Sequence, residues 1–274
     1  MGLEQIIILL VTGVIVGFAA GLLGLGGGFL MTPVQYMVYS SMGLPSDIAT
    51  KMAFGTTLLV ILPTAASGAW AHHRHGAVWW RPAIFMGIFT FVGSLAGATI
   101  AANIPGNILR IAFGIIAIGA SIRMVTAKMP AVEQEPRSNP WLWAAIALPL
   151  GLLTGFLGVG GGIIIIPIMV LVLRFRLHTA VATSLAMMLL TASGGAIGYI
   201  INGMKVPGLP PYSLGYVNLI AFGILAVSSI GLARFGALAA HKIPAKKLNY
   251  IFSAVIFIMG LKMVGFFQWL GLPF

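Results

Sequence analysis

The chain has 274 residues, of which 59% are hydrophobic and 7% are charged. A soluble globular domain carries roughly 25% charged residues, so this composition excludes a water-soluble surface and, with it, a soluble enzyme. The 15 Lys and Arg against 4 Asp and Glu suit an anionic lipid surface or an anionic solute. Nucleic acid is the weakest candidate partner, because the cations are scattered among short loops. The absence of cysteine excludes a disulfide scaffold or a Cys-based metal site.

Long uncharged stretches fill most of the chain: 5–46, 52–71, 82–109, 138–173, 179–204 and 206–233. About 20 apolar residues are needed to cross the hydrocarbon of a bilayer, so most of these stretches hold at least one crossing. Apolar and polar residues do not alternate in these stretches as they do in a barrel strand, and lipid requires the backbone to satisfy its own hydrogen bonds. We therefore predict an all-α polytopic membrane protein. Because no Lys or Arg precedes the first apolar segment, we do not expect that segment to be a cleaved secretory signal.

The second half of the chain repeats the first. The segment Gly17-Phe-Ala-Ala-Gly-Leu-Leu-Gly-Leu-Gly-Gly-Gly28 returns as Gly151-Leu-Leu-Thr-Gly-Phe-Leu-Gly-Val-Gly-Gly-Gly162. Further matches follow in the same order: Pro33 with Pro167, 55–58 with 182–185, 104–105 with 243–244, and 123–125 with 262–264. A match of this length is hard to attribute to shared apolar composition, so we predict two homologous repeats.

Each repeat is predicted to hold four spans. The first repeat covers 1–127, a polar linker covers 128–140, and the second repeat covers 141–274. The eight expected spans are 6–40, 48–70, 82–102, 105–125, 141–173, 178–201, 214–239 and 245–271. On this division Lys and Arg split eight against seven between the two sides, so the positive-inside rule does not choose an orientation. The sequence leaves open whether the repeats are parallel or inverted, because one re-entrant segment would reverse the second.

Two glycine-rich segments, here called the first elbow (24–28) and the second elbow (158–162), are the most informative part of the sequence. Each glycine costs about 1 kcal/mol relative to alanine inside a helix, so three in a row predict a break. Exposed backbone is tolerated at membrane depth only inside protein or beside a water-filled cavity. The uncharged intervals around the elbows hold 42 and 36 residues, too long for one straight span and short of two full spans with a connecting loop. We therefore predict discontinuous or re-entrant first helices.

Each elbow is followed by a proline, Pro33 or Pro167, which is expected to mark the first turn of a new half-helix. The start of such a half-helix offers free N–H groups and about half a positive charge, which suits an anion. Interrupted helices at matching positions of two repeats are typical of a transporter site at the membrane midplane. We therefore predict that the triple glycines contact the substrate: Gly26, Gly27, Gly28, Gly160, Gly161 and Gly162.

Close helix packing is the competing interpretation of the glycines. We favour it for those spaced four residues apart, which are Gly13, Gly17 and Gly21 in the first half and Gly151 and Gly155 in the second. If exposed, these ladders would also allow a homodimer. A dinucleotide-binding loop is a poor interpretation, because no strand–helix unit and no distal acid accompany the glycines.

With these features the sequence resembles the sulfite exporter TauE/SafE family of membrane permeases. The resemblance rests on the twin G-x-x-x-G-x-x-G-[LV]-G-G-G elements with a proline five residues on, on the segments 55–57 and 182–184, and on the duplicated organisation. It covers about residues 6–271. The resemblance implies transport, often export, of small sulfur-containing anions such as sulfite, sulfoacetate or other organosulfonates.

Uncharged hydroxyl and amide groups are the second set of candidate substrate contacts, because O–H and N–H donors suit an oxyanion. They lie in the second span of each repeat, beginning just after the loop, with one amide on the preceding segment: Thr56, Thr57, Ser67, Thr183, Ser184, Ser193 and Gln35. The alternative for the hydroxyls is a hydrogen bond to the preceding helical turn.

Charged residues at the ends of the spans are candidates for gating or for steering anions. Lys51 aligns with His178, and Asp47 lies one turn before Lys51. A snorkelling role at the interface is the alternative for both cations, and we prefer it for Arg123 and Lys262. We expect no metal site in the cluster 72–75, because adjacent histidines on a helix point to different faces and no acid is nearby.

Energy coupling is constrained by the acids, which are Glu4, Asp47, Glu133 and Glu135, all at span ends or in the linker. A carboxylate proton relay inside the membrane is therefore not expected, and no cofactor is implied. Three modes of energy coupling stay open. They are uniport without a coupling ion, coupling through Asp47 or His178, and coupling to a cation held by backbone carbonyls. We predict a secondary transporter, most simply an exporter, in the cell (inner, cytoplasmic) membrane. The alternatives are an anion-selective channel, an uptake permease for another small oxyanion or carboxylate, and an integral-membrane enzyme. An enzyme would need a nucleophile, an acid pair or a metal set in the core, where the sequence offers no carboxylate.

Overall fold

The computed structural model describes residues 1–23, 26–126, 136–239 and 245–269, and these are helical except for loops and one short hairpin. The helices of the first half are α1 (Leu3–Leu23), α2 (Gly28–Ser41), α3 (Ser46–Arg74), α4 (Trp80–Ala102) and α5 (Gly106–Thr126). Those of the second half are α6 (Pro140–Leu157), α7 (Gly162–Leu171), α8 (Leu177–Gly203), α9 (Leu219–Ala239), α10 (Ala245–Val264) and α11 (Phe266–Trp269). The antiparallel hairpin joins β1 (Ser213–Leu214) to β2 (Val217–Asn218), between α8 and α9.

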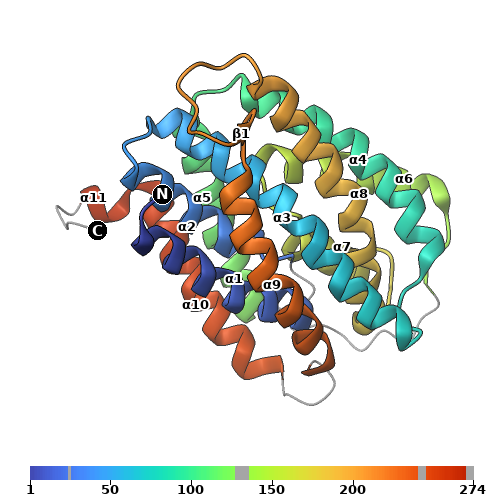
Figure 1. Ribbon diagram of the computed structural model, residues 1–274. Coiled ribbons are helices and arrows are strands. Elements are labelled where there is room, and N and C mark those ends of the chain that lie inside the picture. The colour runs from blue at the N-terminus through green and yellow to red at the C-terminus, as the bar shows by residue number, and fades with distance from the viewer. Residues whose placement is uncertain (24–25, 127–135, 240–244, 270–274) are drawn as a thin grey trace.

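Seven of the described helices, α1, α3, α4, α5, α6, α8 and α9, are long and apolar enough to cross a membrane. The apolar helix α7 and the described apolar part of α10, Tyr250–Val264, are shorter. Figure 1 shows the long helices packed side by side in one bundle. The predicted all-α polytopic architecture is therefore confirmed. The number of eight spans and the division into 1–127, 128–140 and 141–274 stay predictions.

Helices α1 and α2 form a hairpin. The side-chain amide Nε2 of Gln5 donates to Ser41 Oγ at 3.1 Å, so the start of α1 lies beside the end of α2. Gly27, at the turn, faces Val16 in the second half of α1. The 14 residues of α2 extend about 21 Å, which is too short to cross a hydrocarbon layer of about 30 Å. The expected span 6–40 therefore enters and leaves the bundle on one side, here called the near side.

The second half contains the same kind of hairpin on the opposite side, here called the far side. The amide of Arg137, just before α6, donates to the carbonyl of Leu173, just after α7, at 2.9 Å. The starts of the second helices of the two hairpins correct the expectation about the prolines. Helix α2 begins at Gly28 and α7 at Gly162, so Pro33 and Pro167 lie five residues inside their helices and do not mark the first turn.

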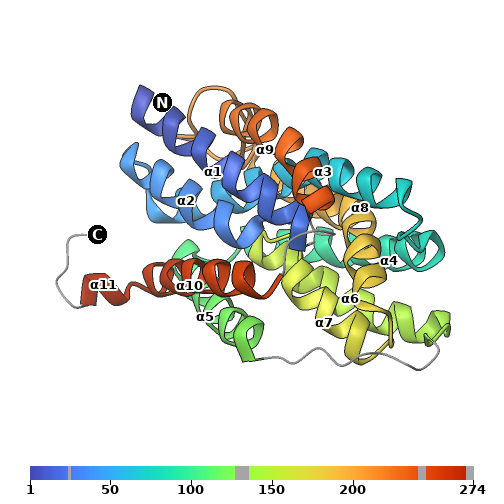
Figure 2. The same ribbon diagram turned by 90° about the horizontal axis from the view of Figure 1, so that it is seen from below.

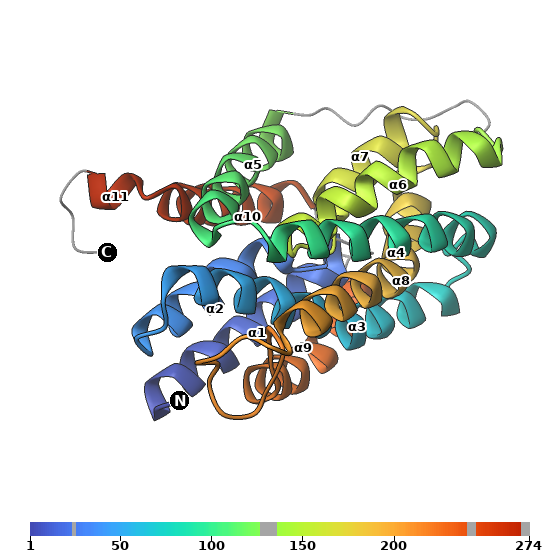
Figure 3. The same ribbon diagram turned by 90° about the horizontal axis from the view of Figure 1, so that it is seen from above.

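Helices from the two halves pack against each other through small residues. Parallel helices α1 and α9 meet at Gly17, whose added Cβ would lie 2.4 Å from the carbonyl oxygen of Ser229. Parallel helices α4 and α6 meet at Gly155, where the same atom would lie 2.0 Å from the carbonyl oxygen of Ser94. The packing role predicted for the glycine ladders is therefore confirmed. Figures 2 and 3 show α5 and α10 crossing at one edge of the bundle, and Gly114 of α5 lies against Gly260 of α10.

The two hairpins change the distribution of charge between the sides. Because each hairpin returns the chain to its side of entry, the even division of Lys and Arg expected from the sequence is wrong. Far-side cations whose side chains the structure describes are Arg74, Arg81, Arg123, Arg137, Arg174, Arg176 and Arg234, whereas those on the near side are Lys51, Arg110, Lys205 and Lys262. The N-terminus lies at the near side, at the left of Figure 1.

We predict that the replacement Gly155→Ala lowers the thermal unfolding temperature in detergent by several degrees, because the α4 backbone leaves no room for a methyl group. Gly119→Ala is the matched control. Position 119 is a helical glycine with open space around it, so alanine there should leave the temperature unchanged or raise it slightly. Equal unfolding temperatures for both variants would contradict this packing.

Candidate functional site

The two elbows lie directly against each other. A Cβ built on Gly28 would lie 2.8 Å from the Cα of Val159, and one built on Gly26 would lie 3.9 Å from the Cα of Gly160. The described glycines of both elbows are buried. The predicted helix interruptions therefore exist and meet in the interior of the bundle, although they are separated by about 130 residues of sequence.

The backbone conformation of these turns requires glycine. Gly27 caps α2 with a φ of 75°, and Gly161 caps α7 with a φ of 79°, both in the left-handed region. Gly26 and Gly158 also have positive φ, at 70° and 66°. Side chains rarely adopt this region, and the space is closed as well, because a Cβ on Gly161 would lie 2.2 Å from Thr154 Cγ2.

The first turn of each half-helix supplies hydrogen-bond donors. The first N–H groups of any helix lack an intrahelical acceptor. In α7 the amides of Gly162 and Ile163 donate to no described residue, and both residues are buried. Buried unpaired amides at a helix start are the groups that bind an anion.

A small apolar cavity adjoins both helix starts. It is lined by Ala19, Gly27, Phe29, Leu30, Ile163, Phe252 and Ile256, from α1, the first elbow, α2, α7 and α10. Free backbone donors and apolar walls therefore occur together at the elbows.

A buried polar cluster joins α2 to α3 beside the second elbow. Thr57 Oγ1 accepts from Gln35 Nε2 at 2.8 Å and from Thr32 Oγ1 at 3.1 Å, and Thr32 lies 3.4 Å from the carbonyl oxygen of Gly158. Tyr39 Oη lies 3.3 Å from Gln35 Oε1 and 3.2 Å from Thr56 Oγ1. All five side chains are fully buried. The hydroxyl hydrogen of Thr57 and one Nε2 hydrogen of Gln35 have no acceptor among the described residues, so the cluster can still donate.

Thr56 and Thr183 have matching roles in the two halves. Thr56 Oγ1 accepts from the amide of Asn218, just before α9, at 3.0 Å. Thr183 Oγ1 accepts from the amide of Trp79, just before α4, at 3.1 Å. Each hydroxyl therefore fixes the start of a crossing helix, and Thr56 also belongs to the polar cluster.

The other predicted hydroxyls bond elsewhere. Ser67 Oγ donates to the carbonyl of Ile230 on α9, whereas Ser184 and Ser193 donate to the preceding turn of α8, at Val181 and Leu189. The structure therefore links Gln35 and Thr57 to the second elbow through Thr32, whereas the hydrogen bonds of Ser67, Ser184 and Ser193 go to other residues.

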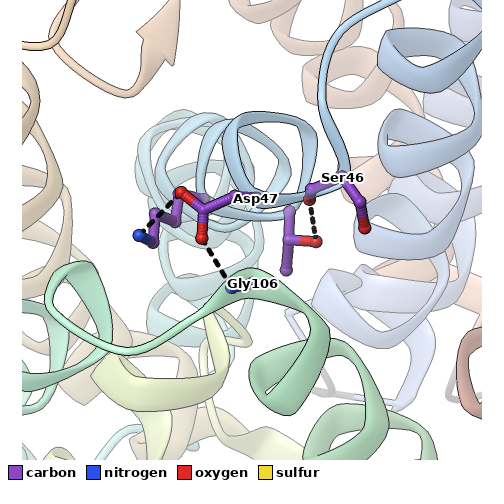
Figure 4. A network of polar contacts seen from close by, with 5 residues as sticks. Ser46, Asp47 and Gly106 are labelled. Atoms are coloured by element: carbon purple, nitrogen blue, oxygen red, sulfur yellow. Dashed lines mark hydrogen bonds and ion pairs between the residues drawn. The ribbon is translucent and has the colours of Figure 1, made fainter.

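The predicted steering residues are at opposite ends of the bundle. Lys51 is only 6% exposed, and its Nζ forms an ion pair with Asp47 Oδ2 at 2.9 Å. Asp47 Oδ1 also accepts from the amide of Gly106 at 2.6 Å, which ties α3 to α5 on the near side (Figure 4). Burial, and then the Asp47 carboxylate, raise the pKa of Tyr216, whose ring lies 5.8 Å from Lys51 Nζ. Tyr216 therefore stays neutral beside the ion pair.

His178 lies at the far-side start of α8, against His72 of α3. The neighbouring His73 points elsewhere and accepts a hydrogen bond from Trp80 Nε1 at 3.0 Å. Adjacent histidines therefore face different directions, as predicted. No group of three His, Cys, Asp or Glu side chains within the described ranges could hold a metal ion.

Sequence reasoning missed three residues of the site. Thr32 and Tyr39 of α2 complete the polar cluster, and Asn218 contacts it through its backbone. The signal that could have identified the first two is their spacing with Gln35, since 32, 35 and 39 fall on one face of a helix. Asn218 caps α9 by accepting from the Ala221 amide at 2.9 Å, which is a local signal typical of a helix start.

The bundle of long apolar helices and the paired half-helices define the class of protein as an integral membrane transporter. Comparison with known proteins supports this class. The family described as "Sulfite exporter TauE/SafE" matches residues 9–263, and the chain belongs to this family. It is a family of membrane transporters and not of enzymes.

Named relatives share most of their length with this chain. "Probable membrane transporter protein MJ0441" of Methanocaldococcus jannaschii is 31% identical over 94% of this chain and 94% of its own length. "Probable membrane transporter protein YunE" of Bacillus subtilis is 29% identical over 94% and 97%. A "Probable membrane transporter protein" of Haemophilus influenzae is 26% identical over 94% and 97%. No solved structure matches the chain.

We predict that Thr56→Val lowers the thermal unfolding temperature by several degrees, because the buried Asn218 amide loses its acceptor at a cost of about 1–3 kcal/mol. Thr56→Ser keeps the acceptor and should stay close to the parent. Differential scanning fluorimetry in detergent measures both. A valine variant as stable as the serine variant would contradict the role given to this hydroxyl.

Proposed function

We propose that the protein is a secondary transporter, acting as an exporter, for small sulfur-containing anions such as sulfite, sulfoacetate or other organosulfonates. The proposal rests above all on the contact between the two elbows, which puts two helix starts with buried N–H groups at one place inside the membrane. Backbone donors and the partial positive charge of a helix start stabilise an oxyanion without requiring a buried cation.

The substrate contacts proposed at this place are the elbow glycines with Gln35 and Thr57. The spare donors of this pair suit sulfonate oxygens, which only accept hydrogen bonds. Apolar walls beside Gly27 suit the carbon part of an organosulfonate. Thr56 and Thr183 support the site by fixing the starts of α9 and α4. Ser67, Ser184 and Ser193 are proposed to contact substrate only in a conformation in which their present hydrogen bonds are broken.

The two halves are proposed to be inverted repeats, which supports alternating access. The first hairpin opens to the near side and the second to the far side, while Thr56 and Thr183 accept equivalent bonds in the two halves. Two halves related in this way can exchange an outward-open for an inward-open arrangement around a fixed central site. The described elbow residues are buried, which suits a closed state between the two.

The far side is proposed to face the cytoplasm and the membrane to be the cell membrane. The far side carries more described cations than the near side, seven against four, and cytoplasmic loops are enriched in Lys and Arg. The chain contains no cysteine, so single cysteines label each side without background. A cysteine replacing His75 should react with an impermeant maleimide only after cells are permeabilised, and one replacing Tyr212 should react in intact cells. The reverse pattern would overturn the orientation.

Anion flux into proteoliposomes tests the function. Purified protein should transport sulfite or sulfoacetate with saturation and with stimulation by substrate on the opposite side, and it should favour these over sulfate and chloride. Gly161→Leu should reduce the flux at least tenfold, because the side chain blocks the helix start and strains the turn. Gly119→Leu, at an open position on α5, is the control.

A second variant tests the site without changing the elbow turn, because Gly161→Leu could lose flux through misfolding alone. Gln35→Glu keeps the size of the side chain but replaces the amide donor with a carboxylate, so it should repel the anion and lower the flux. Unchanged flux in both Gly161→Leu and Gln35→Glu would exclude the elbows as the pathway. Flux without saturation or stimulation by substrate on the opposite side would favour the second candidate, an anion-selective channel.

A further inference from the structure

The near-side end of α3 carries a buried cation. The side chain of Lys51 is 7% exposed, and its Nζ forms an ion pair with Asp47 Oδ2 at 2.9 Å. A lysine that only snorkels to the membrane interface keeps its ammonium in water, and a side chain this buried does not. Phe54, one turn further along α3, packs against Gly158 at the start of the second elbow. Lys51 therefore precedes the second elbow by about 4.5 Å along the helix axis.

One short hairpin covers both Lys51 and the polar cluster beside the second elbow. The ring of Tyr216 lies over Lys51, with Nζ 5.8 Å from the ring centroid. Two residues further on, the amide of Asn218 donates to Thr56 Oγ1 of the cluster at 3.0 Å. Tyr216 and Asn218 are both buried. Lys51 and the polar cluster therefore lie behind the same near-side cover.

The two partners of the ion pair are held differently. Asp47 Oδ1 also accepts from the amide of Gly106 at 2.6 Å, and the Asp47 side chain is 47% exposed (Figure 4). An ammonium has three N–H donors on a flexible four-carbon stem. Among the described residues, Asp47 is the only one that accepts from Lys51. Lys51 is therefore the partner that can turn to another acceptor, while Asp47 keeps the Gly106 amide and its contact with water.

The duplicated fold does not require this ion pair. Residues 55–58 of the first half match 182–185 of the second, so Lys51 corresponds to His178 and Asp47 to Arg174. His178 is exposed, and a histidine and an arginine do not attract each other as a lysine and an aspartate do. Helix α8 thus begins on the far side without the equivalent of this pair. The pair belongs to the near side alone, which points to a task there.

We propose that Lys51 forms a second anion subsite between the elbows and the near side, where it binds the sulfonate or other small oxyanion that leaves the elbows. The subsite rests on the proposed function, because it needs an anion that passes through the elbows. At this subsite the anion takes the place of Asp47 on the ammonium. A buried cation that loses its partner is strongly destabilised, and the exchange of one anion for the other keeps Lys51 paired.

Competition between the anion and Asp47 also provides for release. Asp47 stays near the ammonium, because its bond to the Gly106 amide fixes it. When the carboxylate returns to Lys51 it displaces the anion, and the two like charges repel each other. The subsite therefore holds the anion only transiently on its way to the near side.

The affinity for sulfoacetate tests the subsite, measured as binding of the radiolabelled anion to purified protein in detergent at fixed pH and ionic strength. The variants are Lys51→Gln, Asp47→Asn, the double variant with both changes, and Lys205→Gln. Asparagine keeps an oxygen that can accept from the Gly106 amide, so Asp47→Asn removes the charge and preserves the contact between α3 and α5. Lys205→Gln is the matched control, because Lys205 is an exposed near-side lysine that forms no ion pair with a described residue.

The two single changes should act in opposite directions. Lys51→Gln removes the cation and should weaken binding about tenfold, whereas Asp47→Asn removes the competitor and should strengthen binding by a similar factor. The gain from Asp47→Asn should vanish in the double variant, which has no ammonium to free. Lys205→Gln should bind like the parent. If Asp47→Asn folds poorly, sulfoacetate should still raise its thermal unfolding temperature more than that of the parent.

The opposite signs separate this subsite from a purely structural ion pair. A structural pair would lose affinity in both single variants or change it in neither, and either result would overturn the subsite. A gain from Asp47→Asn that persists in the double variant would overturn it as well.

Failure of the subsite and failure of the proposed function give different results. Opposite signs with sulfate or chloride as the bound anion, and no binding of sulfoacetate, would contradict the proposed function only. Transport of sulfoacetate with equal affinities in all variants would contradict the subsite only. A parent that binds none of these anions would contradict both.

Discussion

The structure depends on one constraint, which is that backbone N–H and C=O groups cannot be left unpaired in hydrocarbon. Two helices of this chain are broken at triple glycines, and each break would be unfavourable if it faced lipid. The molecule avoids this cost by burying the two breaks against each other, with the Cα atoms of Val159 and Gly160 in contact with the first elbow. The amides that donate to no described residue, such as those of Gly162 and Ile163, then lie in the interior, where an anion is the natural partner.

The packing of the long helices follows from the same arrangement. For the elbows to meet, α1 and α6 must approach the centre from opposite sides, and each does so beside a helix of the other half, α9 or α4. Glycines at these contacts let the backbones come close, because hydrocarbon gives no hydrophobic drive for helices to associate. Each half contributes structure that the other needs: Thr56 anchors the start of α9, and Thr183 anchors the start of α4. We therefore expect the halves to fold together.

Much of the fold could be predicted from the sequence, because its signals are local. The low charge and long apolar runs indicated a helical membrane protein, the triple glycines indicated broken helices, and the four-residue ladders indicated packing. What could not be predicted depends on contacts between distant segments. The reversal of α2 against α1 is visible only in the pairing of Gln5 with Ser41. Without that reversal the cations were divided evenly between the sides, and the start of α2 at Gly28 put Pro33 inside the helix and not in its first turn.

Only part of the candidate site could be predicted from the sequence. Its glycines stood out because few residues tolerate a φ near 75°, whereas the partners of its hydroxyls depend on which helix lies opposite. Thr57 faces Gln35, but Ser67 faces α9. The contact between His72 and His178 joins residues of different halves, and nothing in the local sequence of either residue indicates it.

The most direct measurement of the central claim is a structure determined with a transported sulfonate bound, using a bromine-containing analogue whose anomalous signal locates the anion. We expect the sulfonate oxygens to lie within hydrogen-bond distance of the amides at Gly28 and Gly162, with the bromine marking the carbon end nearby. A bound anion resolved elsewhere in the bundle, with both elbows still closed by protein contacts alone, would contradict it.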